Sequence, residues 1–151
     1  MKLKIKGIVV DLFISKDGFD GRIEEEELVV DESGVFVDKF YAKDVERSVL
    51  VTSINSYKIV EKENISIVYG DLGENILVDF DLNLLKDGTQ LQIGDVILEI
   101  TQKCTICDHL NKIDNRVPAL LEHDRGVFAK VIQGGIIKKG STIGLDDKNN
   151  G

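Results

Sequence analysis

Short runs of Val, Ile and Leu, separated by glycines, recur along the whole chain. Glycine occurs 14 times and proline once, and this punctuation is typical of a barrel or sandwich of short strands. Gly94 and Asp95 separate two alternating runs, which predicts a β-hairpin. The clearest strands are expected over Leu3–Val10, Leu28–Val30, Val49–Thr52, Gln90–Ile93, Val96–Gln102 and Val127–Ile132.

Helical patterns are weaker and shorter than the strand patterns. Ser53 is a candidate N-cap for a helix that continues to Glu63, because Ile54 and Tyr57 keep helical spacing. Further short helices are expected over Asp108–Asp114 and from Pro118, a favoured first-turn residue, to Glu122. The pattern therefore predicts a mainly β fold, a closed or nearly closed β-barrel with a few short helices.

Length and charge restrict the classes of function. A chain of 151 residues is expected to form one domain, over residues 1–145, followed by a polar tail over residues 146–151. The net charge of −8 opposes binding to nucleic acid or to an anionic membrane surface, so neither partner is expected. The first residues lack a signal-peptide pattern and no apolar run is long enough to span a membrane, so a cytoplasmic protein is expected.

Cys104 and Cys107 directly follow the strand that is expected to end at Gln102. With His109 and His123 they would form a zinc site of unusual spacing. A thioredoxin-like redox pair would need a strand–helix alternation that the chain lacks. The remaining interpretations are a thiolate that binds a soft metal or carries sulfur as a persulfide, and plain small core residues. The residues alone leave all four interpretations open.

A second group of candidate residues contains glycines and polar side chains. Gly70 and Gly73 allow a sharp turn or a close approach to a ligand, and Glu74 and Asn75 follow them directly. Arginines elsewhere in the chain could hold a phosphate or carboxylate through their planar guanidinium groups. The candidates for this role are Arg47 and Arg125.

Three segments, taken in order, resemble the MOSC family, the module at the C-terminus of molybdenum-cofactor sulfurases. Residues 70–76, GDLGENI, resemble its G-x-x-G-E-N-[IL] segment. Residues 88–102 resemble its strand pair G-T-x-L-x-I-G-x-[AV]-x-L-x-[VI]-T-x, and residues 125–140 resemble its closing block with the pattern G-[IV]-[FY]-A-x-V-x-x-G-G. The similarity extends over residues 7–143.

The resemblance implies a β-barrel similar to the pyruvate-kinase insertion barrel, and a protein that binds molybdenum cofactor (molybdopterin) or carries sulfur. Cys107 matches the family's cysteine, which implies that it is the catalytic thiolate, as a persulfide carrier or a molybdenum ligand. The residues implied in cofactor binding are Asp38, Arg47, Gly73, Glu74, Asn75 and Arg125. The implied partners are a sulfur donor such as a cysteine desulfurase, a molybdoenzyme or an electron donor. Pyridoxal phosphate is not expected on this domain, since no lysine is identified for its Schiff base.

The chain departs from the family pattern in one segment. The family often has G-L-x-G-D-x-H before its arginine, whereas residues 34–40 are GVFVDKF. Val37 thus replaces a glycine and Phe40 replaces a histidine, while Asp38 and Arg47 still match. Losing the histidine removes a ligand or an acid–base group. The alternative function is therefore a non-catalytic cofactor-binding or scaffold module that serves a partner enzyme.

Overall fold

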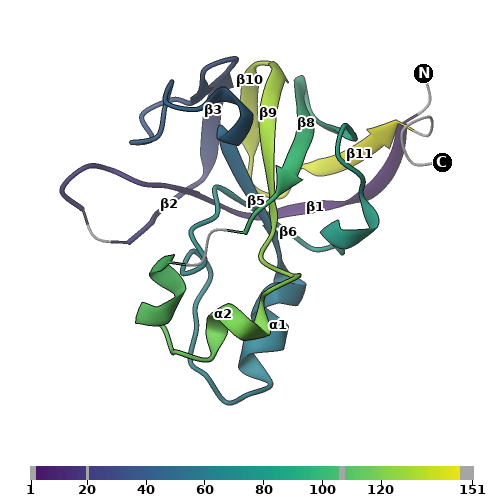
Figure 1. Ribbon diagram of the computed structural model, residues 1–151. Coiled ribbons are helices and arrows are strands. Elements are labelled where there is room, and N and C mark those ends of the chain that lie inside the picture. The colour runs from purple at the N-terminus through teal and green to yellow at the C-terminus, as the bar shows by residue number, and fades with distance from the viewer. Residues whose placement is uncertain (1–2, 20, 106–107, 147–151) are drawn as a thin grey trace.

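The computed structural model describes residues 3–19, 21–105 and 108–146, and its main feature is a closed barrel of seven strands (Figure 1). Pairing between β1 (Leu3–Ile14) and β11 (Thr142–Asp146) closes the sheet. The strands follow in the order β1 (Leu3–Ile14), β11 (Thr142–Asp146), β7 (Gln90–Ile93), β8 (Val96–Lys103), β9 (Val127–Gln133), β5 (Val49–Ser53) and β6 (Ile76–Val78). The predicted fold class is confirmed.

The long strand β1 makes closure possible because it pairs with different neighbours along its length. Its first part pairs with β11, and its second part pairs with β6 and with β2 (Ile23–Glu25). The register shifts between Ile5 and Gly7, and again between Val9 and Asp11. Such bulges bend a strand and increase its twist, which lets one strand serve two sides of a barrel.

A small antiparallel sheet lies beside the barrel and contains β10 (Gly135–Lys138), β3 (Glu27–Asp31) and β4 (Gly34–Val35). Its inward side chains, including Leu28, Val30 and Ile137, join the apolar interior of the barrel in one core. The small sheet therefore covers part of the barrel rather than forming a separate domain.

Two short α-helices, α1 (Ile54–Glu61) and α2 (Val117–Leu120), lie at one end of the barrel (Figure 1). The Ser53 hydroxyl caps α1 by accepting from the Asn55 amide at 3.1 Å. The helix connects the parallel strands β5 and β6. Together with neighbouring loops, the helices enclose a second apolar core that includes Tyr57, Val60, Leu72, Leu110 and Leu121. The site described below lies where this core meets the barrel.

Local predictions agree with the structure, with small shifts of the element ends. Ile93 pairs with Val96 across the two-residue turn, so the predicted hairpin is confirmed. The helix capped by Ser53 is also confirmed and ends at Glu61. The helix predicted from Asp108 is a 3₁₀ helix, η3 (Asp108–Lys112), and the helix predicted from Pro118 corresponds to α2 (Val117–Leu120). The other 3₁₀ helices are η1 (Val45–Arg47) and η2 (Leu82–Leu84). No helix in the described part of the chain is long and apolar enough to cross a membrane.

Candidate functional site

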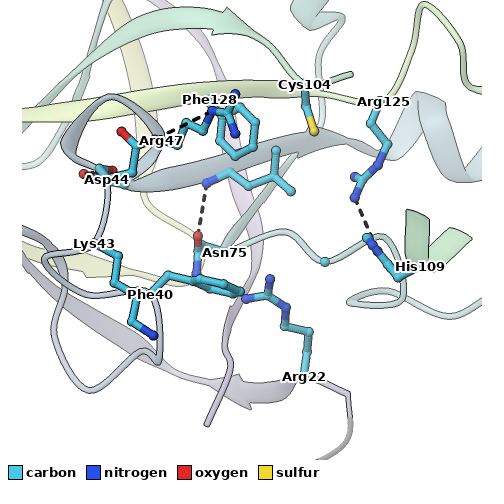
Figure 2. Close-up of a pocket in the computed structure, with 13 residues that line it drawn as sticks. Arg22, Phe40, Lys43, Asp44, Arg47, Asn75, Cys104, His109, Arg125 and Phe128 are labelled. Carbon is cyan, nitrogen blue, oxygen red and sulfur yellow. Dashed lines mark hydrogen bonds and ion pairs between the residues drawn. The ribbon is translucent and has the colours of Figure 1, made fainter. Parts of the chain in front are cut away.

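A pocket of about 350 Å³, called the inner pocket below, lies between the barrel wall and the loops beside it (Figure 2). Its cationic side chains outnumber its carboxylates among the described lining residues. The polar and charged side chains that line it include Arg22, Lys43, Asp44, Arg47, His109 and Arg125. Phe40, Leu50, Cys104 and Phe128 add apolar surface. On a chain of net charge −8, this local excess of cations favours an anionic ligand.

Arg125 is the most deeply buried cation in this pocket. The residue is only 3% exposed. Its Nε and Nη1 atoms have no hydrogen-bond partner among the described residues. Gly126, with φ of +130°, directly follows it, and a Cβ there would lie 2.5 Å from the Val51 carbonyl oxygen. The close approach that only glycine permits thus brings Arg125 against β5, and its two unsatisfied nitrogens could donate hydrogen bonds to an anion.

His109 and Arg22 join Arg125 around Gly73. Arg125 Nη2 lies 3.4 Å from His109 Nε2. A Cβ at Gly73 would meet His109 Nε2 at 3.2 Å and Arg22 Nη2 at 3.5 Å. Figure 2 shows the Arg125 guanidinium directed at the His109 ring, with Arg22 reaching the pocket from another loop. The absence of a side chain at Gly73 thus lets three nitrogen-bearing groups converge.

The pKa values of His109 and Arg22 are both lowered. Desolvation lowers the pKa of His109 from its ordinary value of 6.5, and the charge of Arg125 lowers it further. Burial also lowers the pKa of Arg22, while the carboxylate of Asp38 opposes that change. An arginine remains charged at neutral pH despite such a shift. The cluster therefore favours a neutral imidazole between guanidinium groups.

Arg47 lines the opposite part of the pocket and is more exposed. Its side chain is 45% exposed, and its Nε lies 3.8 Å from Asp44 Oδ2. Its guanidinium carbon lies 5.6 Å from the centre of the Phe128 ring, a distance at which a cation is attracted to an aromatic face. The predicted arginine therefore lies in the same pocket as Arg125, but with partners of its own.

Cys104 contributes the thiol that the structure places at this pocket. It follows β8, is only 3% exposed, and its amide donates to the Gly126 carbonyl at 2.9 Å. Figure 2 shows its sulfur directed into the pocket that Arg125 and Arg22 also line. Cys107, the predicted reactive cysteine, lies outside the described residues, so its role stays a prediction.

Asn75 and Glu74 hold the pocket wall in place. The Asn75 side chain accepts from the Leu50 amide at 3.0 Å and donates to the Phe13 carbonyl at 3.2 Å, which joins β5 to β1. Glu74 is fully buried, and its two carboxyl oxygens lie 2.9 and 2.6 Å from the Tyr57 hydroxyl. Burial raises the pKa of Glu74. Asn75 therefore lines the pocket. Glu74 does not line it, and its carboxyl group instead accepts from Tyr57 beneath the pocket wall.

Asp38 is also buried and does not line the inner pocket. Its carboxylate accepts from the amides of Ser15 at 2.7 Å and Phe40 at 3.0 Å, and lies 3.6 Å from Arg22 Nη1. It therefore fixes the loop that carries Phe40 and provides a counter-charge for Arg22. Of the residues implied in cofactor binding, the structure places Arg47, Gly73, Asn75 and Arg125 on the pocket surface.

No sequence pattern points to Arg22, which lies in the connection between β1 and β2. From the sequence, His109 is a candidate zinc ligand, an acid or base near neutral pH, or a hydrogen-bonded bystander. A zinc site is not supported by the described residues, among which no cluster of metal-binding side chains occurs. The His123 side chain is 83% exposed and lies beside Glu122. Convergence of Arg22 and His109 depends on contacts across the fold, which no local pattern reveals.

A wider hollow of about 530 Å³, called the outer cleft below, adjoins the inner pocket. The two hollows share Arg22, Phe40, Gly73 and His109. Phe40, which stands where the family pattern has histidine, is 47% exposed at this junction. The site as a whole can bind an anion in its inner part, beside a thiol, and remains accessible through its outer part.

Comparisons with known proteins agree with this architecture. YuaD from Bacillus subtilis superposes with a TM-score of 0.74 at 17% identity, covering 95% of this chain and 98% of that one. YiiM from Geobacillus stearothermophilus gives a TM-score of 0.76 at 14% identity, covering 94% and 76% of the two chains. YiiM from Escherichia coli gives 0.72 at 17% identity, covering 94% and 70%. These likenesses show the fold.

The sequence comparison is more specific. No curated protein sequence matches the chain significantly. The model of the MOSC domain, however, matches residues 37–144, which include the glycine loop, the hairpin, both cysteines and Arg125. This match covers more than half of the chain, and the chain belongs to the MOSC domain family.

Proposed function

We propose that this protein binds molybdenum cofactor in the inner pocket, with the anionic group of the cofactor held by Arg125 and Arg22. The observation that carries the proposal is the guanidinium of Arg125, which is buried at the pocket with two nitrogens that lack partners among the described residues. Leaving such a donor unsatisfied costs about 1–3 kcal/mol, and a phosphate oxygen would relieve that cost.

The chemistry of the pocket fits the group that the family implies. Arg125, Arg22 and Arg47 provide forked donors for phosphate oxygens, and Phe128 and Leu50 provide apolar surface for a ring system. Cys104 offers a soft sulfur of the kind that binds molybdenum-type metals. When bound, the cofactor would supply the redox chemistry of its metal, while the protein would position it and limit the access of water.

Reconstitution tests the proposal. The purified protein would be incubated with molybdopterin and examined by native mass spectrometry, with molybdenum analysis of the same sample. We expect a bound ligand on the parent and its loss from the Arg125→Gln variant. Arg116→Gln is the matched control, because the Arg116 side chain is 55% exposed and pairs with Asp114 at 3.0 Å, away from both hollows. Equal loading of the parent and Arg125→Gln would contradict the proposal.

A second candidate function is sulfur carrying by Cys107, which matches the family's cysteine and lies three residues after Cys104, a residue that lines the cation-rich pocket. Nearby cations stabilise a thiolate. In this role the Cys107 thiolate would attack the terminal sulfur of a persulfide on a cysteine desulfurase. A new S–S bond would form, the donor's S–S bond would break, and the donor would leave as a thiolate.

Mass spectrometry of the protein after incubation with a cysteine desulfurase and cysteine tests this second function. We expect a mass gain of one sulfur atom, lost on reduction. Cys107→Ser should abolish the gain, and Cys104→Ser should retain it, because Cys104 is almost completely buried. An adduct that survives in Cys107→Ser but disappears in Cys104→Ser would transfer the role to Cys104. No adduct on the parent would exclude sulfur carrying.

A further inference from the structure

The outer cleft is a hollow that the proposed cofactor pocket does not account for. It continues from the inner pocket past Arg22 and Gly73, and adds Lys39 and Lys112 to the shared residues. Its volume of about 530 Å³ exceeds the 350 Å³ of the inner pocket. Both values lie within the range of about 300–1,000 Å³ that is usual for ligand sites.

The outer cleft has a positive charge of its own. Neither Lys39 nor Lys112 has an ion-pair partner among the residues that the structure describes. The carboxylate that lines the cleft, Asp71, accepts from the Val68 amide at 2.9 Å. Two ammonium groups that no described carboxylate pairs with, both lining one hollow, attract anions even though the whole chain is acidic.

Phe40 organises these cations at the junction of the two hollows. The Lys39 ammonium lies 5.1 Å from the centre of its ring, and the Arg22 guanidinium carbon lies 6.0 Å from it. Both distances allow attraction between a cation and an aromatic face. Arg22 therefore faces both hollows, with Arg125 on its inner side and Lys39 on its outer side.

We propose that the outer cleft is a second anion subsite, and that the two hollows together bind a ligand with two or more linked phosphates. This inference rests on the proposed function of the inner pocket. One phosphate would bind at Arg125 and the next at Arg22, on the side toward the outer cleft. A third phosphate, in a longer ligand, would lie between Lys39 and Lys112. The site would thus favour a diphosphate-linked form of its ligand over a monophosphate.

Calorimetric titration with orthophosphate, pyrophosphate and tripolyphosphate tests the inference. For the parent we expect tripolyphosphate to bind at least about tenfold more tightly than orthophosphate, because added charge-assisted contacts contribute on the order of 1.4 kcal/mol or more. The Lys39→Ala/Lys112→Ala double variant should lose this advantage and keep its affinity for orthophosphate. Arg125→Gln should bind all three probes weakly.

The matched control is the Lys58→Ala/Lys62→Ala double variant, which removes the same charge from exposed positions that line neither hollow. It should behave as the parent. If the parent binds orthophosphate but gains nothing from the longer chains, the second subsite is refuted and the inner pocket stands. If Lys58→Ala/Lys62→Ala loses as much as Lys39→Ala/Lys112→Ala, the advantage is general charge attraction and the subsite is again refuted. If the parent binds none of the probes, both the inner anion site and the second subsite are refuted.

Discussion

Arg125 Nη2 lies 3.4 Å from His109 Nε2, so a guanidinium and an imidazole meet at the wall of one pocket. The contact is compatible with a neutral ring, because an unprotonated ring nitrogen can accept from the guanidinium. The lowered pKa of His109 agrees with that arrangement. His109 therefore contacts the Nη2 atom of Arg125, while the Nε and Nη1 atoms of the guanidinium stay available for a ligand.

Gly73→Ala should disrupt the convergence of His109 and Arg22. Gly73 has φ of +87°, and an added Cβ would meet both side chains at 3.2 and 3.5 Å. We expect a loss of about 1 kcal/mol in unfolding free energy from the backbone, together with weaker orthophosphate binding. Chemical denaturation and calorimetry would measure the two effects.

Gly88→Ala separates backbone strain from the effect on the site. Gly88 has a similar φ of +91°, but an added Cβ there meets nothing within 4 Å. We expect the same loss of stability with unchanged anion binding. If both alanine variants weaken binding equally, the spacing around Gly73 has no special role.

Glu74 should make the stability of the protein depend on pH. Burial raises its pKa from the ordinary value of 4.5, so the fold favours the neutral carboxyl. The stabilisation is fully present below pH 4.5 and is lost as pH rises through the raised pKa. In Glu74→Gln the side chain stays neutral and can still bond to Tyr57. Urea unfolding from pH 4 to pH 8 should show the parent losing stability relative to this variant; parallel curves would contradict the assignment.

Val37→Gly should stabilise the protein. Val37 has φ of +63° and is 59% exposed, and a β-branched residue is strained in this left-handed conformation. The family pattern has glycine at this position. We expect a gain of about 1 kcal/mol in unfolding free energy, since relief of strain exceeds the entropy that glycine adds to the unfolded chain. Ala42→Gly, with φ of +62°, is the comparison and should gain less, because alanine is not β-branched.

The barrel was largely predictable because its signals are local. Alternating apolar residues around Gly94 and Asp95 set the hairpin, and the Ser53 hydroxyl caps α1 as expected. The strand β6 escaped prediction because it has only three residues, too few for a recognisable strand pattern, whereas the longer β5 was predicted although it is buried throughout. Whether such a short buried segment forms a strand depends on the strands that pair with it.

The site was predictable only in part. Arg47, Gly73, Asn75 and Arg125 lie in segments that resemble the family, and all line the inner pocket. Glu74 shares such a segment, yet it turns away because the Tyr57 hydroxyl, 17 residues distant in sequence, offers it a buried partner. Arg22 and His109 converge only after the β1–β2 connection and the helix η3 pack around Gly73. Contacts of this kind arise from the tertiary fold.

The most direct test of the anion site is calorimetric titration of molybdate into the parent, Arg125→Gln and Arg116→Gln. Circular dichroism would first establish that the variants are folded. We predict one molybdate site on the parent and on Arg116→Gln, and an affinity lower by about tenfold or more in Arg125→Gln, because a charge-assisted hydrogen bond contributes about 1.5–3 kcal/mol. Equal affinity of folded Arg125→Gln and the parent would contradict the account.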